Sequence, residues 1–131
     1  MIMTQEDKEL LLKDLSARLP FGVRCSFGVD DAIYEITGIN PSSCGASEIQ
    51  ATHVKSSING DFKFVSCKPY LFPLSSMTEE QKQELKGLIF QNAFSNNTTF
   101  TQQDFFCKYH LDYRGLIQLG LAIDATVLNI Y

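Results

Sequence analysis

The sequence predicts an α+β fold: an N-terminal helix, an antiparallel meander of about four strands, and two or three C-terminal helices packed on one face. Apolar residues recur at helical spacing at the start of the chain, alternate with polar residues through its middle, and return to helical spacing after residue 76. The 131 residues, 44% of them hydrophobic, suffice for one core. Because no repeat or linker interrupts them, we expect a single domain over residues 1–131.

The first helix is predicted from Gln5 to Arg18. Thr4 is a good N-cap, and acidic residues follow it in the first turn, where the helix dipole favours them. Pro20 ends the helix, because a residue that precedes proline avoids the α region. The leucines at helical spacing are Leu11, Leu12, Leu15 and Leu19.

Strand patterns occupy the middle of the chain. The alternation and the β-branched content predict strands over residues 23–27, 32–39, 48–57 and 62–68. Asn59-Gly60 is the strongest hairpin signal, since both central positions of a type I′ turn need positive φ. We therefore expect this dipeptide to join the third and fourth strands.

After these strands, Pro69 to Pro73 is predicted to be an extended apolar connector, kept out of a helix by its prolines. Two overlapping capping boxes follow, Ser76 with Glu79 and Thr78 with Gln81. They predict a helix that runs to about Phe90, and a polar loop over residues 91–99.

The C-terminal part contains a second set of caps. Thr101 with Asp104 predicts a short helix to about His110, with Phe100 and Phe105 as its hydrophobic staple. Asp112 is expected to cap a further short helix over residues 113–119. Gly120 then stands where a C′ glycine belongs, and residues 127–131 are a candidate last strand.

Charge and motifs exclude several classes of function. The net charge of −4 gives no general attraction to phosphate backbones, so no nucleic acid is expected as a partner. Gly115 and Gly120 have P-loop spacing, but the Lys-Ser/Thr of that motif is missing after Gly120. With only two histidines, a His-rich metal site is excluded, and no cofactor is expected.

The N-terminus predicts no secretory signal, and no apolar run is long enough to cross a bilayer. We therefore expect a cytoplasmic protein without membrane association, with reduced thiols. Its cysteines are Cys25, Cys44, Cys67 and Cys107.

The candidate binding residues are His110, Asp112, Tyr113 and Arg114, the densest polar and aromatic cluster in the sequence. Tyrosine and arginine anchor many protein interfaces, and the planar fork of an arginine can hold a carboxylate. The structural alternative is that Asp112 caps a helix and Arg114 pairs with a nearby acid. The leading hypothesis is a non-enzymatic protein-interaction module with an unidentified protein partner.

The runner-up hypothesis is an enzyme or small-ligand binder that uses Cys107, His110 and Asp112. Cys107 and His110 share a helix face at this spacing, and a thiolate beside an imidazolium can act as a nucleophile. The alternative is that Cys107 is a small core residue and that His110 suits the helix C-terminus.

Three blocks of the sequence resemble a family of small proteins of uncharacterised activity, widespread in gut Bacteroidetes and their mobile elements. The blocks are DLSARLPFGV (residues 14–23), KPYLFPLSSMTEE (68–80) and HLDYRGLI (110–117) with GLA (120–122). Family members often carry an aromatic-Leu-Asn stretch before the histidine, where this chain has Phe105-Phe106-Cys107. This departure argues against Cys107 as a family nucleophile. The resemblance implies a bacterial or phage cytoplasmic protein with an accessory role, and no particular activity.

Overall fold

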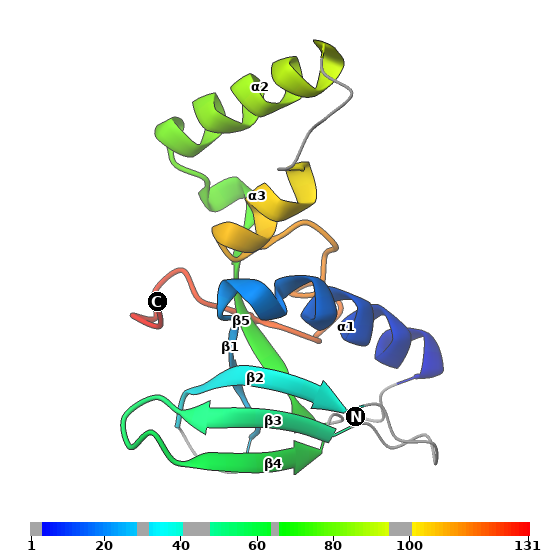
Figure 1. Cartoon of the computed structure of the whole chain (residues 1–131), viewed down its shortest axis with the longest axis vertical. Helices are drawn as coiled ribbons and strands as arrows, with labels where there is room; N and C mark the ends of the chain where they lie inside the picture. The colour runs from blue at the N-terminus through cyan, green and yellow to red at the C-terminus, as the bar shows by residue number, and fades with distance from the viewer. Residues whose placement is uncertain (1–3, 29–31, 41–47, 64–65, 95–100) are drawn as a thin grey trace.

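The computed structural model describes residues 4–28, 32–40, 48–63, 66–94 and 101–131 (Figure 1). Its helices are α1 (Gln5–Arg18), α2 (Glu79–Phe94) and α3 (Gln102–Lys108), with short 3-10 turns η1 (Leu19–Phe21) and η3 (Leu74–Ser76). Its strands are β1 (Arg24–Ser26), β2 (Tyr34–Asn40), β3 (Glu48–His53), β4 (Asn59–Lys63), β5 (Lys68–Pro73), β6 (Leu111–Asp112) and β7 (Ile123–Asp124).

Helix α1 has the bounds expected from the sequence. The Thr4 hydroxyl accepts the Asp7 N–H at 3.1 Å, and the Asp7 carboxylate accepts the Thr4 N–H at 3.4 Å, which completes a capping box. The turn that contains Pro20 ends at Gly22, whose φ of 74° is left-handed. Leu11 and Leu15 are fully buried in the main core.

The described strands form one mixed sheet in the order β4-β3-β2-β1-β5-β6. Strand β7 is not part of this order and pairs with β5. Strands β1 to β4 are antiparallel neighbours in chain order, and β5 returns antiparallel beside β1. The predicted meander is therefore present in β1 to β4. The prediction did not include β6 and β7. Each of these strands has two residues and pairs in parallel with β5.

The hairpin between β3 and β4 exists, but its predicted turn is wrong. Asn59 and Gly60 lie inside β4, paired with Thr52 and Ala51. The chain turns earlier, where Ser57 has a φ of 59° and donates its N–H to the His53 carbonyl at 2.8 Å. Gly60 is needed for space instead, since a Cβ there would lie 3.0 Å from the Phe62 ring.

The segment over residues 69–73 is extended, as predicted, but it is not a connector, because it belongs to strand β5 in the centre of the sheet. β5 contacts β1 on its antiparallel side and pairs in parallel with β6 and β7. Its prolines occupy the second and last positions of the strand, near the strand ends, where a missing ladder N–H is best tolerated. Leu71 is fully buried between them.

Helices α2 and α3 begin at the predicted caps. Thr78 and Gln81 exchange the two hydrogen bonds of a capping box at 2.9 and 3.1 Å. Thr101 does the same with Asp104, at 2.9 and 3.2 Å. Helix α2 continues to residue 94, past the expected end at Phe90. The rest of the predicted loop, and Phe100 of the predicted staple, lie outside the described residues.

The two C-terminal helices do not pack across the sheet as predicted. Along the long axis of Figure 1, the strands β2 to β4, then α1, α3 and α2 follow one another. Helix α2 packs on α3, and α3 also contacts α1. These helices enclose a second hydrophobic core, whose buried residues are Leu88, Phe105 and Leu111. Phe72 of β5 packs against this core and connects it to the sheet. Leu85 and Leu88 are the residues of α2 that pack into this core, whereas Ile89 and Phe90 of the same helix are exposed.

Two short C-terminal elements differ from expectation. Residues 113–119 form turns and no regular helix, although the N–H groups of Gly120 and Leu121 bond to the carbonyls of Ile117 and Leu116. This is a Schellman pattern, with Gly120 at a φ of 76° as predicted for a C′ glycine. Residues 127–131 form no strand; the short strand lies earlier, at β7.

Candidate functional site

The predicted binding residues lie where the chain leaves α3 and enters β6. His110 adopts a left-handed φ of 56°, rare for a residue with a side chain. Its N–H donates to the Cys107 carbonyl at 3.2 Å, and its carbonyl accepts the Phe72 N–H at 2.8 Å. His110 therefore turns the backbone from the helix into the parallel pairing with β5.

Asp112 is buried, and its carboxylate accepts hydrogen bonds from backbone N–H groups that follow it in the chain. Its two carboxylate oxygens accept the N–H groups of Leu116 at 2.8 Å and Ile117 at 2.9 Å. Hydrogen bonds to a charged group are stronger than those between neutral partners. The capping role expected of Asp112 is thus present, although it holds a run of turns and not a helix.

Arg114 belongs to a buried ionic cluster that reaches across the fold. Its Nε lies 3.2 Å from Oδ1 of Asp14, whose Oδ2 accepts from Arg18 Nε at 2.7 Å. Arg18 also donates through Nη2 to the Leu111 carbonyl at 2.6 Å. The side chains of Asp14 and Arg18 are fully buried, and that of Arg114 is 15% exposed. Within this group, two guanidinium ions share one carboxylate.

Tyr113 covers this ionic cluster. Its ring stacks on Phe106 with centroids 5.2 Å apart. The guanidinium carbons of Arg114 and Arg18 lie 4.8 and 5.3 Å from the Tyr113 centroid, within cation–π range. Burial raises the pKa of the Tyr113 hydroxyl. The ring therefore packs between an aromatic neighbour and two cations.

The His110 ring stacks on Tyr131, with centroids 3.7 Å apart and planes 10° apart. The Tyr131 hydroxyl accepts the Arg24 N–H at 2.8 Å and donates to the Tyr70 carbonyl at 2.9 Å. Burial, with smaller contributions from Arg18 and Arg24, lowers the pKa of His110 to about 4. The imidazole is therefore neutral at pH 7. Its stack on Tyr131, together with the hydrogen bonds of that hydroxyl, holds the C-terminal segment against the sheet.

The surroundings of Cys107, His110 and Asp112 act against their use as a nucleophilic site. Cys107 is fully buried, and burial raises its pKa, which suppresses the reactive thiolate. His110 is stacked on Tyr131, and Asp112 is engaged by backbone N–H groups. His110 and Asp112 thus have structural contacts of their own, and Cys107 is enclosed in the core.

Within residues 4–28, 32–40, 48–63, 66–94 and 101–131, no group of three or more His, Cys, Asp or Glu side chains is placed to hold a metal ion. In the same ranges, none of the helices is both long and apolar enough to cross a membrane.

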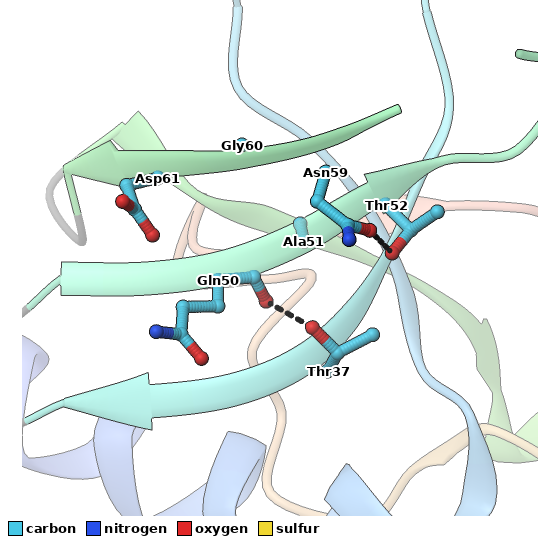
Figure 2. A pocket seen from close by; sticks show the side chains of 7 residues that line it. All are labelled: Thr37, Gln50, Ala51, Thr52, Asn59, Gly60 and Asp61. Atoms are coloured by element: carbon cyan, nitrogen blue, oxygen red, sulfur yellow. Dashed lines mark hydrogen bonds between the residues drawn. The ribbon is translucent and has the colours of Figure 1, made fainter. Parts of the chain in front are cut away.

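A polar hollow of about 420 Å³ lies on β2, β3 and β4 (Figure 2). Its lining consists of Thr37, Gln50, Ala51, Thr52, Asn59, Gly60 and Asp61. The Thr52 hydroxyl donates to Asn59 Oδ1 at 2.6 Å, and the Thr37 hydroxyl donates to the Gln50 carbonyl at 3.2 Å. These bonds hold the side chains of three neighbouring strands on one face.

The glycines of these strands shape the surface around the hollow. At Gly38, next to the register shift in β2, a Cβ would lie 2.7 Å from Oε1 of Gln50. Gln50 can therefore lie across β2 only because residue 38 has no side chain. Two amides, a carboxylate and two hydroxyls thus share one surface, which can exchange hydrogen bonds with a polar partner.

Strand β4, which lines this hollow, is the first strand in the sheet order and pairs with β3 on one side. The His53 N–H donates to the Ile58 carbonyl at 2.9 Å, and Thr52 pairs with Asn59. In an antiparallel ladder, hydrogen-bonded and non-hydrogen-bonded pairs alternate. Gly60 and Phe62 therefore point their backbone groups at β3. Asn59 and Asp61 point theirs away from the sheet.

Sequence reasoning missed this surface, although a signal was present. Polar residues alternate with apolar or small ones at Gln50, Thr52, Asn59 and Asp61, which is the pattern of a sheet face turned away from the core. The Asn59-Gly60 pair hid the signal, because it favoured a turn where the chain forms a strand.

Comparison with known proteins supplies no relative. No protein-family model, no curated protein and no solved structure matches this chain.

Proposed function

We propose that this chain is a non-enzymatic protein-interaction module that binds its partner through the outer surface of β2 to β4. We call this surface the meander face and define it by Glu35, Thr37, Gln50, Thr52, Asn59 and Asp61. The observation that supports the proposal is the polar hollow beside the last strand of the sheet order.

The chemistry of the meander face suits a polypeptide. Its hydroxyl and amide groups both donate and accept hydrogen bonds, and protein interfaces carry about one such bond per 100–200 Å². Its charged members are the carboxylates of Asp61 and Glu35, and Arg24 Nε lies 3.7 Å from Glu35. Among the side chains that the structure describes, no cation lines the hollow itself. A partner with basic side chains complements this surface, whereas a phosphate backbone does not.

In this proposal the residues His110, Asp112, Tyr113 and Arg114 support the fold and do not contact the partner. Their hydrogen bonds, stacks and ion pair all lie within the chain. They join α1, β5 and the C-terminal segment, and so hold the body on which the meander face is built. An accessory role in a bacterial or phage cytoplasm, implied by the family resemblance, is part of the same proposal.

A capture experiment with charge-matched variants tests this function. The face variant is Gln50→Lys/Asp61→Lys, and the control is Gln83→Lys/Glu80→Lys, which makes the same charge change on exposed positions of α2. Tagged proteins would be exposed to lysate of the source organism, and captured proteins identified by mass spectrometry. We expect a partner that the wild type and the control retain and the face variant loses. Equal capture by both variants would refute the meander face as the binding surface.

A further inference from the structure

We infer that the partner binds as an extended basic segment that adds a strand to the outer edge of β4. This inference rests on the proposed function and specifies its mode. The segment would carry a lysine or arginine opposite Asp61, with apolar residues on either side.

The hydrogen-bonding groups of β4 provide the first argument. Asn59 and Asp61 direct their N–H and C=O groups away from β3, as the ladder alternation requires. Among the described residues, no further strand pairs with β4 on that side. An edge of this kind is a template for strand addition, in which main-chain hydrogen bonds supply affinity.

The side chains of β4 define which segment fits. Asp61 lies on the meander face and is exposed, whereas Phe62 lies on the opposite face and stacks on Phe27 with centroids 4.1 Å apart. A residue paired with Asp61 would lie beside its carboxylate, and the residues before and after it would lie on the side of Phe62. The matching pattern is therefore apolar–basic–apolar.

The same carboxylate argues against a second copy of this chain as the occupant. An antiparallel pairing of two β4 edges centred on Asp61 would place the two Asp61 side chains directly opposite each other. Like charges at opposite positions destabilise a strand pair. A basic segment removes this repulsion and gains an attraction at the same position.

Two seven-residue probes test the inference, each acetylated at its N-terminus and amidated at its C-terminus. One has the pattern Ser-Thr-Val-Lys-Val-Thr-Ser, and the other has glutamate in place of lysine. Each would be titrated into the full chain, with amide chemical shifts and hydrogen exchange followed by NMR. We expect slower exchange at Asn59 and Asp61, little change at Gly60 and Phe62, and binding of the lysine probe about five-fold tighter or more.

An Asp61→Lys variant completes the test. The position is exposed, so the variant should keep the spectrum of a folded chain while the preference reverses toward the glutamate probe. Unchanged exchange at Asn59 and Asp61 with either probe at millimolar concentration, or equal affinity for both, would overturn strand addition. If the face variant nevertheless loses its partner in the capture experiment, the interaction function stands and only this binding mode falls.

Discussion

Asp14 of α1 and Arg114, which follows β6, form an ion pair in which Oδ1 and Nε are 3.2 Å apart and the carboxylate is fully buried. Through Arg18, the same carboxylate is connected to the carbonyl of Leu111. One buried aspartate therefore ties the first helix to the segment that the sequence marks as the most polar and aromatic. This relationship gives the candidate binding segment a structural role at the junction with α1.

The first prediction concerns Asp14→Asn. The change removes the carboxylate that Arg18 and Arg114 share and leaves the buried Arg18 and the partly buried Arg114 without it. Breaking a buried ion pair from one side costs about 3–5 kcal/mol of unfolding free energy. Urea denaturation followed by circular dichroism measures the loss. Glu9→Gln on the exposed side of α1 serves as the control, and a loss no larger than in this control would contradict the role given to Asp14.

The second prediction concerns Asp112→Ala. The N–H groups of Leu116 and Ile117 lose a charged acceptor in a buried place, and the expected loss of unfolding free energy is about 3 kcal/mol. Asp124→Ala is the matched control, because its exposed carboxylate also accepts a backbone N–H, from Thr126. Thermal unfolding of the two variants should show a clear fall for the first and a nearly unchanged midpoint for the second.

The third prediction is a pH dependence from His110. Burial lowers its pKa in the fold from 6.5 to about 4, so the unfolded chain takes up this proton first as the pH falls. The contribution to stability is complete above pH 6.5 and is lost progressively as the pH drops toward 4. It amounts to no more than about 3 kcal/mol, and less because the ring is partly exposed.

His110→Phe isolates this effect, since phenylalanine keeps an aromatic ring against Tyr131 and cannot titrate. Urea denaturation at pH 7.5 and pH 4.5 should show a larger loss for the wild type than for the variant. Any cost of a bulky side chain at the left-handed backbone applies at both pH values and cancels from the comparison. Identical losses would show that His110 does not titrate below its ordinary range.

The fourth prediction concerns thiol reactivity. Cys107 is fully buried and its pKa is raised, so iodoacetamide should modify it far more slowly in the native chain than in urea. Peptide-level mass spectrometry follows Cys107 separately from the other cysteines. Rapid native alkylation of Cys107 would restore the nucleophile hypothesis.

Much of the fold follows from local signals that agree with one another. For α1, the cap at Thr4, the leucine spacing and Pro20 all indicate the same helix, and the structure has those bounds. The caps at Thr78 and Thr101 act in the same way. Such elements are predictable because the groups that fix them lie within one or two turns of the chain.

The errors arise where distant contacts outweigh local preference. Asn59-Gly60 favours a turn, but both residues lie in β4, where they pair with Thr52 and Ala51 of β3. The segment from Pro69 to Pro73 lacks the usual strand pattern, yet its neighbours in the sheet make it a strand. Strands of two residues, such as β6, exist only through their pairing with β5, so no sequence period predicts them.

The candidate site shows the same division. The polarity of Asp112 to Arg114 was visible in the sequence, and so was a capping role for Asp112. The partner of Arg114 was not, since Asp14 lies in the first helix and only the tertiary fold brings the two together. The alternation at Gln50 and Thr52 was visible as well, but the register that places Asn59 and Asp61 beside them was not.

The most direct test of the central claim is a site-specific photocrosslink. A benzoyl-phenylalanine would be placed at Thr52 in the meander face, or at Gln83 on α2 as a control, and the full chain irradiated in lysate of the source organism. The interaction-module account predicts a covalent adduct with one partner from Thr52 and none from Gln83. Adducts of equal yield at both positions, or none at Thr52, would contradict it.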